Sequence, residues 1–196
     1  MQRGFVLWRL FIPYPRILSL FVALGEEMID QNIDLTVGEI LDRAIKIEKR
    51  VADLYAIFTK RFSHVPGMSD FWSDLRRDEI GHMGELRVVY ESLPAEKLKA
   101  PESRAVSISV HRAMACVDDA CLSRVKTLDD AYEIARNLEF SEINTVFEYL
   151  TMDLVPASSR DEMVTYQVEE HEKKLVDFDQ LYGDKNWRSQ FLIQPE

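Results

Sequence analysis

The sequence contains few of the residues that interrupt helices and few that form disulfides or thiolate metal sites. Its 196 residues include only seven glycines, seven prolines and two cysteines. Long stretches without glycine or proline favour helices over a sheet-rich fold. Cys116 and Cys121 form neither a CxxC pair nor a disulfide framework, so no iron–thiolate module is indicated. We expect both thiols to be reduced, in a reducing compartment.

Positive charge is also scarce. The chain has 24 Lys and Arg against 34 Asp and Glu, which gives a formal net charge of −10. Nucleic acid is therefore excluded as an expected partner, because its phosphates would be repelled. An acidic surface favours an approaching cation, although solvated surface acids explain the same composition. The length fits one domain with a substantial core.

Residues 1–35 are rich in apolar side chains but do not show the pattern of a spanning helix. Arginines and prolines interrupt the run well short of the ~20 apolar residues that a membrane requires. We expect an N-terminal arm or extension, with Met28 as an alternative natural start. A signal peptide over residues 1–25 and a membrane anchor are the other interpretations. We divide the rest into a helical domain over 36–182 and a C-terminal tail over 183–196, in a cytoplasmic protein.

Two helices are expected in the first half of the domain. Thr36, with Glu39 three residues later, predicts a capped helix that runs to about Phe62. Ser69 predicts the cap of a second helix, which Pro94 ends.

Both helices carry acidic or imidazole side chains inside an otherwise apolar stripe. Glu48 lies in the stripe of the first helix, and Glu79 and His82 lie in that of the second. An ionised carboxylate on a buried stripe costs free energy unless it is paired with a cation, hydrogen-bonded or protonated. A salt bridge from Glu48 to Arg77 or Arg87 is the simpler explanation for that acid.

A long connection separates these two helices from the second half of the domain, which repeats their arrangement. Pro101 and an alternating apolar pattern over 106–110 interrupt the helical periodicity, so only a short helix over 111–123 is expected there. A connection of this length suits a long crossover between two helices of a bundle.

The third and fourth helices are predicted over 127–154 and from Ser158 or Ser159 to 182. Asp129 and Asp130 suit the first turn of the third helix. Glu139 and Glu142 face its buried side, and His171 lies on the apolar stripe of the fourth.

Five of these side chains form the pattern of a metal site in an all-α, four-helix bundle. Such bundles can hold two metal ions with one carboxylate from each of two helices and Glu-x-x-His from each of the other two. The chain supplies Glu48, Glu79, His82, Glu139 and His171. Carboxylates and imidazole without thiolate favour iron, with manganese as an alternative, over structural zinc.

Three further side chains have simpler expected roles. His64 lies in a predicted turn, and His111 lies in the crossover without a carboxylate at the required offset, so both are expected to be structural or solvated. Tyr55, two turns after Glu48, is expected in the core. A hydrogen-bond donor or redox-active phenol above the site is the alternative.

The ordered segments IEKRVADLY, RRDEIGH, ARNLEFSEI and VEEHEKKL resemble the rubrerythrin branch of the ferritin-like superfamily, over about residues 36–182. The resemblance implies a ferritin-like bundle whose di-iron centre activates dioxygen, reduces peroxide or oxidises iron. By position, Glu48, Glu79 and His82 resemble one half-site, with Glu79 bridging. Glu139 and His171 resemble part of the other. Rubrerythrins proper also carry an iron–thiolate domain, which has no counterpart here, so a redox function implies a separate electron donor.

A valine occupies one ligand position of that pattern. Val168 stands three residues before His171, where the family has a second bridging carboxylate, and valine cannot coordinate a metal. Glu169 cannot replace it, since one residue rotates ~100° around a helix. Glu142 shares a face with Glu139 and is either a substitute ligand or a partner for a lysine or arginine.

Three functions follow from this incomplete set. The first is a redox or iron-oxidising protein with two metal ions. The second is a single-metal protein using Glu48, Glu79 and His82 in storage, sensing or delivery. The third is a metal-free scaffold that works through protein contacts, against which the intact first half-site argues. We also expect a homo-oligomer.

Overall fold

The protein is all-α in the part of the chain that the structure describes. The computed structural model describes residues 34–117, 122–139, 150, 154 and 173–195. The chain divides into two compact units, Met1–Gln31 and Asn32–Glu196, and every described residue belongs to the second. Among the described residues no β-strand forms, and two isolated bridges, Thr36–Pro101 and Thr127–Leu192, join loop positions. Within those residues, no helix is long and apolar enough to cross a membrane.

Helix α2 spans Val37–Arg61 and begins where the sequence predicts. The Thr36 hydroxyl accepts a hydrogen bond from the Glu39 amide at 3.3 Å, and the Glu39 carboxylate accepts one from the Thr36 amide at 2.8 Å. This reciprocal pair satisfies two amides that the first helical turn leaves without partners. The predicted capping box is therefore confirmed.

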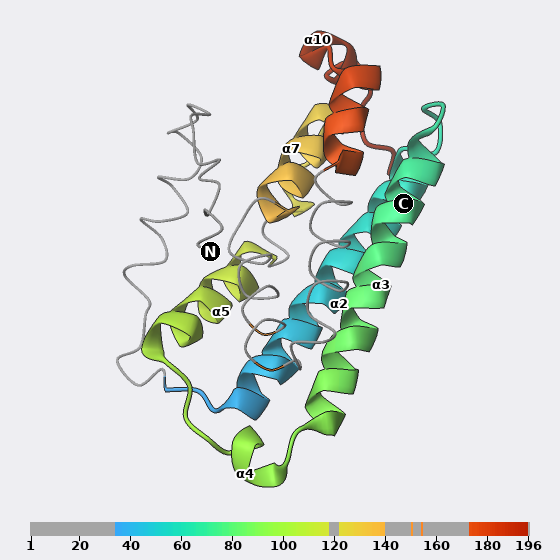
Figure 1. The fold of residues 1–196 in the computed structure, drawn as a ribbon. Coiled ribbons are helices and arrows are strands. Elements are labelled where there is room, and N and C mark those ends of the chain that lie inside the picture. The colour runs from blue at the N-terminus through green and yellow to red at the C-terminus, as the bar shows by residue number, and fades with distance from the viewer. Residues whose placement is uncertain (1–33, 118–121, 140–149, 151–153, 155–172, 196) are drawn as a thin grey trace, which may run out of the picture. The chain divides into compact units, whose positions relative to one another are not determined.

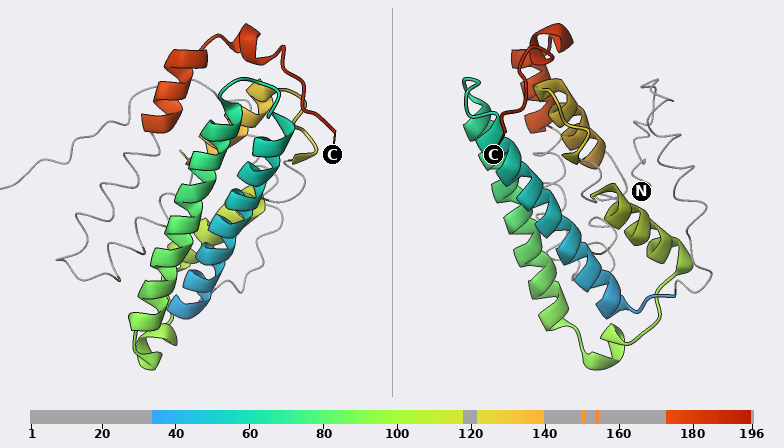
Figure 2. Two further views of the ribbon diagram at one scale, coloured as in Figure 1. Left: turned by 90° about the vertical axis from the view of Figure 1, so that its right-hand side faces the viewer. Right: turned by 180° about the vertical axis from the view of Figure 1, so that it is seen from behind.

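Helix α3 spans Met68–Ser92 and runs antiparallel to α2 along most of its length (Figures 1 and 2). Its N-cap is Gly67, and the predicted cap Ser69 lies inside the first turn, so that prediction was wrong. Gly67 has a φ of 80°, a left-handed conformation that glycine adopts without steric cost. A Cβ there would also lie 2.5 Å from the Tyr182 hydroxyl. The tight turn between α2 and α3 therefore requires glycine.

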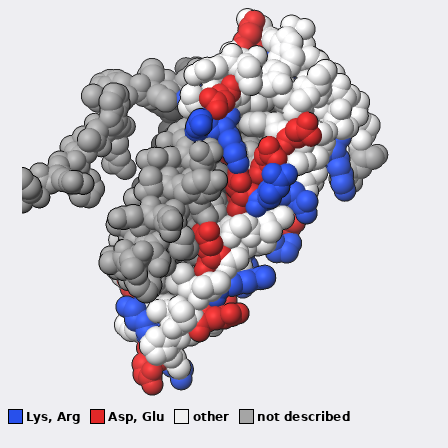
Figure 3. Space-filling model, turned by 45° about the vertical axis from the view of Figure 1, so that its right-hand side comes forward, with Lys and Arg blue, Asp and Glu red and all other residues white. Residues whose placement is uncertain are grey.

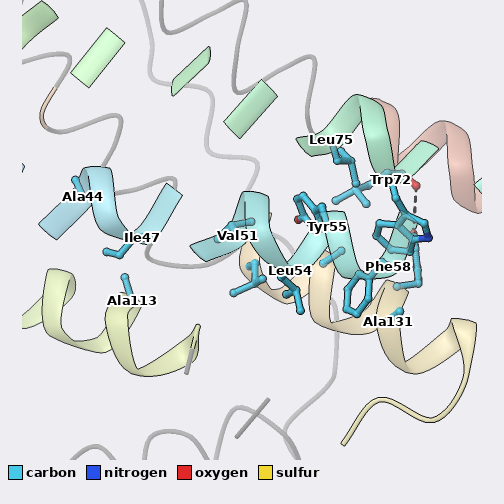
Figure 4. Packing of buried hydrophobic residues seen from close by; sticks show 14 of the residues in the cluster. Ala44, Ile47, Val51, Leu54, Tyr55, Phe58, Trp72, Leu75, Ala113 and Ala131 are labelled. Carbon is cyan, nitrogen blue, oxygen red and sulfur yellow. Dashed lines mark hydrogen bonds between the residues drawn. The ribbon is translucent and has the colours of Figure 1, made fainter. Parts of the chain in front are cut away.

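The connection after α3 includes, among its described residues, the helices α4 (Ala95–Leu98) and α5 (Arg104–Cys116). The prediction that helical order resumes only at 111 was wrong. The Ser103 hydroxyl accepts a hydrogen bond from the Val106 amide and starts α5 seven residues earlier. The alternating apolar residues over 106–110 thus belong to α5. The Ala113 side chain of this helix faces α2 (Figure 4). The connection is long, as predicted, but its described residues before 117 are more helical than predicted.

Helix α7 spans Leu128–Glu139 and begins at the predicted place. Thr127 and Asp130 bond reciprocally: the Asp130 amide donates to the Thr127 hydroxyl at 3.1 Å, and the Asp130 carboxylate accepts from the Thr127 amide at 2.9 Å. Residues 150 and 154 are helical, as is the segment 173–182. The predicted start of the fourth helix lies outside the described residues.

Aromatic rings fill the core between α2, α3, α7 and the segment 173–182 (Figure 4). Tyr55, Phe58 and Trp72 are fully buried, and the Trp72 ring lies 5.8 Å from that of Tyr55 and 5.0 Å from that of Phe58. Phe178 brings 173–182 against this group, because its ring stacks on Phe71 at 4.3 Å. Rings of this size dominate core burial, and these hold the C-terminal half of α2 against the N-terminal half of α3.

The C-terminal segment packs against the start of α7. It contains α10 (Lys185–Arg188), and backbone hydrogen bonds join Leu128 to Phe191 and Ile193 to Lys126, each at 2.8 Å. The residues predicted as a tail, 183–196, are thus ordered over 183–195.

Candidate metal centre

Four of the five predicted ligands lie in the described part of the chain. Glu48 is near the middle of α2, Glu79 and His82 are near the middle of α3, and Glu139 is the last residue of α7 that the structure describes. The fifth, His171, lies outside the described residues, as do Val168 and Glu142.

The local structure explains why α2 and α3 bring their ligands together. Residues three apart on a helix lie on the same face, so Glu79 and His82 project from one side of α3. Glu48 sits at a matching depth on the antiparallel α2. Only 3% of Glu48, 2% of Glu79 and 6% of His82 is exposed, and Glu139 is 4% exposed. Four ionisable side chains are therefore buried, and burial of such groups is costly without compensation.

Glu48, Glu79 and His82 form one compact group of potential ligand atoms. His82 Nδ1 lies 3.2 Å from Glu79 Oε2 and 3.8 Å from Glu48 Oε2. One ligand atom from each of the three residues lies within 4.8 Å of the others. Separations of this size allow a single ion to contact all three.

Glu79 is the electrostatic centre of the group. Burial raises its pKa well above the usual value, and the negative charges of Glu139 and Glu48 raise it further. Hydrogen bonds with both of these carboxylates act in the same direction. Without a metal, the site therefore favours a proton on Glu79, since like charges so close cannot all ionise cheaply. A divalent cation would offset the negative charge of the buried carboxylates, as the proton does when no cation is bound.

Tyr55 is both a core residue and a neighbour of the site. Its side chain is fully buried, and its hydroxyl donates a hydrogen bond to Glu139 Oε1 at 2.7 Å. Burial and the nearby charges of Glu139 and Glu79 raise the pKa of Tyr55 well above its usual value. The phenol consequently keeps its proton and fixes the Glu139 carboxylate. In the sequence, Tyr55 stands two helical turns after Glu48. That spacing fits a hydrogen-bond donor at the site and an ordinary core residue equally well.

The arginine and the two histidines with simpler expected roles are not part of the Glu48–Glu79–His82 group. Arg77 is exposed and pairs with Asp74 at 2.8 Å, whereas Glu48 is buried beside His82. His111 accepts a hydrogen bond from Arg43 at its Nε2, 2.8 Å away, and donates from Nδ1 to a backbone carbonyl, that of residue 107. His64 is exposed in the turn after α2. His64 and His111 are thus structural or solvated, as predicted.

The donor set fits iron or manganese. Carboxylate oxygens and an imidazole nitrogen are the ligands these ions accept, and nothing in the group calls for a thiolate-binding metal. The burial of the group and the mutual repulsion of its carboxylates both favour occupation by a cation.

Comparison of the chain with protein-family models, with curated proteins and with solved structures finds no match.

The raised pKa of Glu79 predicts an unusual pH dependence for metal-free protein. The folded state binds this proton more tightly than the unfolded state does. The stabilisation by this proton is therefore complete below the pKa of Glu79 in the unfolded state, about 4.3. It is lost as pH rises through the raised pKa of Glu79 in the folded state. In that range the free energy of unfolding falls by at most about 1.4 kcal/mol per pH unit. Urea unfolding between pH 4.5 and 8, in wild type and Glu79→Gln with chelator present, measures it. The substitution should remove this component, and identical pH profiles would contradict the assignment.

Proposed function

We propose that this chain is an iron-binding protein of the rubrerythrin-like, ferritin-like type, with manganese as the alternative ion. The observation that supports this most is the convergence of Glu48, Glu79, His82 and Glu139. They come from three helices, yet all are buried, and Glu79 interacts with the carboxylates of Glu48 and Glu139 and lies 3.2 Å from His82. The family resemblance of the sequence motifs points to the same residues.

Each side chain has a distinct role in this proposal. Glu48, Glu79 and His82 hold one ion, with Glu79 positioned between the carboxylates of Glu48 and Glu139. Tyr55 fixes Glu139 on the other side of Glu79 through the 2.7 Å hydrogen bond. A ferritin-like four-helix arrangement would complete the second half-site with His171.

Iron bound here would supply one-electron chemistry toward dioxygen or peroxide, so a peroxidase-like or iron-oxidising reaction is the activity we propose. The protein excludes water from the ligands through the surrounding core, which strengthens electrostatic interactions at the site. Electrons would come from a separate donor. A cytoplasmic location suits such a protein, because both cysteines are expected to be reduced.

A single-metal binding protein is the second candidate. It is favoured by the compactness of Glu48, Glu79 and His82, which alone provide three ligands within 4.8 Å. Valine at the second bridging position weakens the other half-site in the sequence. Storage, sensing or delivery would require only this first site.

Metal stoichiometry distinguishes the two candidates. The full chain would be titrated anaerobically with ferrous iron and its bound metal counted. Two ions per chain support the redox proposal, one supports the single-metal candidate, and none contradicts both.

Val168→Glu should raise the stoichiometry toward two. Residue 168 is three before His171, so on a helix the new carboxylate shares the face of that imidazole. Its charge offsets that of a second cation, and oxygen or peroxide consumption should increase. The measurement is metal content with thermal unfolding in the presence and absence of iron. Lost stability that iron does not restore, with unchanged metal content, would show that residue 168 serves only in packing.

A further inference from the structure

Helix α3 presents a second face, opposite the metal centre, that carries exposed apolar side chains. Ile80 is 44% exposed and Val88 is 67% exposed, while Glu79 and His82 point into the core from the same helix. Gly84 lies midway between Ile80 and Val88, four residues from each. All three fall on one side of the helix, since residues four apart are neighbours on its surface.

The glycines on this face are not required by packing within the described chain. A Cβ built at Gly81 or at Gly84 meets no atom within 4 Å. Glycine inside a helix costs about 1 kcal/mol relative to alanine. Both positions leave the α3 backbone open to close approach by another helix, and the two apolar side chains flank that opening.

The charges on the same face are complementary about Gly84. Arg77 stands seven residues before Gly84, and Glu91 stands seven residues after it. Seven residues are two helical turns, or about 10.5 Å. An antiparallel second copy of α3 centred on Gly84 therefore brings Arg77 to the partner's Glu91, and Ile80 to the partner's Val88. Reversal of the helix reproduces both pairs, which is the condition for a two-fold interface.

We propose that the protein forms a homodimer in which α3 packs antiparallel against α3 of a second copy, with the two-fold axis at Gly84. Arg77 is 74% exposed at its side chain, and its pair with Asp74 is a surface ion pair of small energy, so it can exchange partners. Figure 3, which brings this side of the molecule forward, shows charges of both signs interspersed with uncharged side chains. This proposal does not depend on metal binding.

Charge reversal tests the register directly. Arg77→Glu and Glu91→Arg should each weaken the dimer by about tenfold or more, because each places like charges together at both ends of the interface. An equimolar mixture of the two variants should regain wild-type affinity, since a heterodimer contains two opposite-charge pairs. Sedimentation equilibrium of the full chain measures all three association constants. Arg50→Glu, an exposed reversal on α2, is the control and should leave the dimer intact.

Gly84→Leu supplies an independent test. A large side chain at the axis should prevent close approach and yield a folded monomer, as judged by circular dichroism together with sedimentation. A wild-type chain that stays monomeric would overturn the proposal. So would a dimer that tolerates both reversals, or variants that fail to pair when mixed.

Discussion

Glu79→Gln should abolish most iron binding while making the metal-free protein more stable. The amide keeps the shape of the side chain but removes the anionic group, our proposed ligand, that interacts with both Glu48 and Glu139. Loss of supporting groups around a metal costs about 10–100-fold in affinity, so loss of a direct ligand should cost at least about 100-fold. Without metal, the substitution removes a buried acid whose ionisation the neighbouring carboxylates oppose. Anaerobic titration calorimetry with ferrous iron measures the affinity.

The stability of the same variant is measured by thermal unfolding with chelator at pH 8. A gain of about 1 kcal/mol would raise the Tm by about 2–4 °C in a chain of this size. Glu96→Gln, an exposed change on α4, is the matched control and should alter neither property. His111→Ala should also retain iron, because that imidazole bonds to Arg43 away from the site. If His111→Ala lost the metal and Glu79→Gln kept it, the ligand set would be wrong.

Arg188→Ala should destabilise the fold by about 3 kcal/mol or more, although Arg188 is not one of the predicted ligands. Arg188 Nε donates to Asp129 Oδ1 at 2.9 Å, and these side chains are 5% and 8% exposed. Its Nη1 bonds to Asp179 at 3.0 Å, and its guanidinium lies 4.4 Å from the centre of the Tyr132 ring. Removal of Arg188 leaves the buried Asp129 carboxylate with only the exposed Lys185 ammonium as a partner among the described residues, and the loss of one partner of a buried ion pair typically costs about 3–5 kcal/mol.

Lys185→Ala is the control for that prediction. Lys185 Nζ lies 3.5 Å from Asp129 Oδ2, but its side chain is 67% exposed. An exposed ion pair contributes about 0–1 kcal/mol, so this variant should differ little from wild type. Urea unfolding of both variants supplies the comparison. Equal losses would mean that the Arg188 pair contributes no more than an ordinary surface contact.

The sequence predicted those features that a local pattern or a fixed helical spacing determines. Residues within one helical turn of each other determine several of these features. They are the Thr36–Glu39 cap, the start of α7 and the C-terminal ends of α2 and α3. The burial of Glu48 and the shared face of Glu79 and His82 follow from a 3.6-residue period. Buried acids on an apolar stripe are rare without a role, so the same pattern also indicated a site.

Features that depend on tertiary contacts were missed. Ser69 looked like a helix cap, but the close approach of Tyr182 and the left-handed backbone at Gly67 place the cap elsewhere. The buried Asp129–Arg188 pair joins residues 59 positions apart, and no local spacing marks it. The hydrogen bond from Tyr55 to Glu139 spans 84 positions and likewise required the packed structure.

Anomalous diffraction at the iron absorption edge, from crystals of the full chain loaded with ferrous iron under argon, tests the metal centre most directly. We predict a strong peak enclosed by Glu48, Glu79 and His82, within coordination distance of an atom from each, and absent in Glu79→Gln. A second peak beside Glu139 would identify the two-metal form. Iron found only at surface carboxylates, with a metal-free core, would contradict the account.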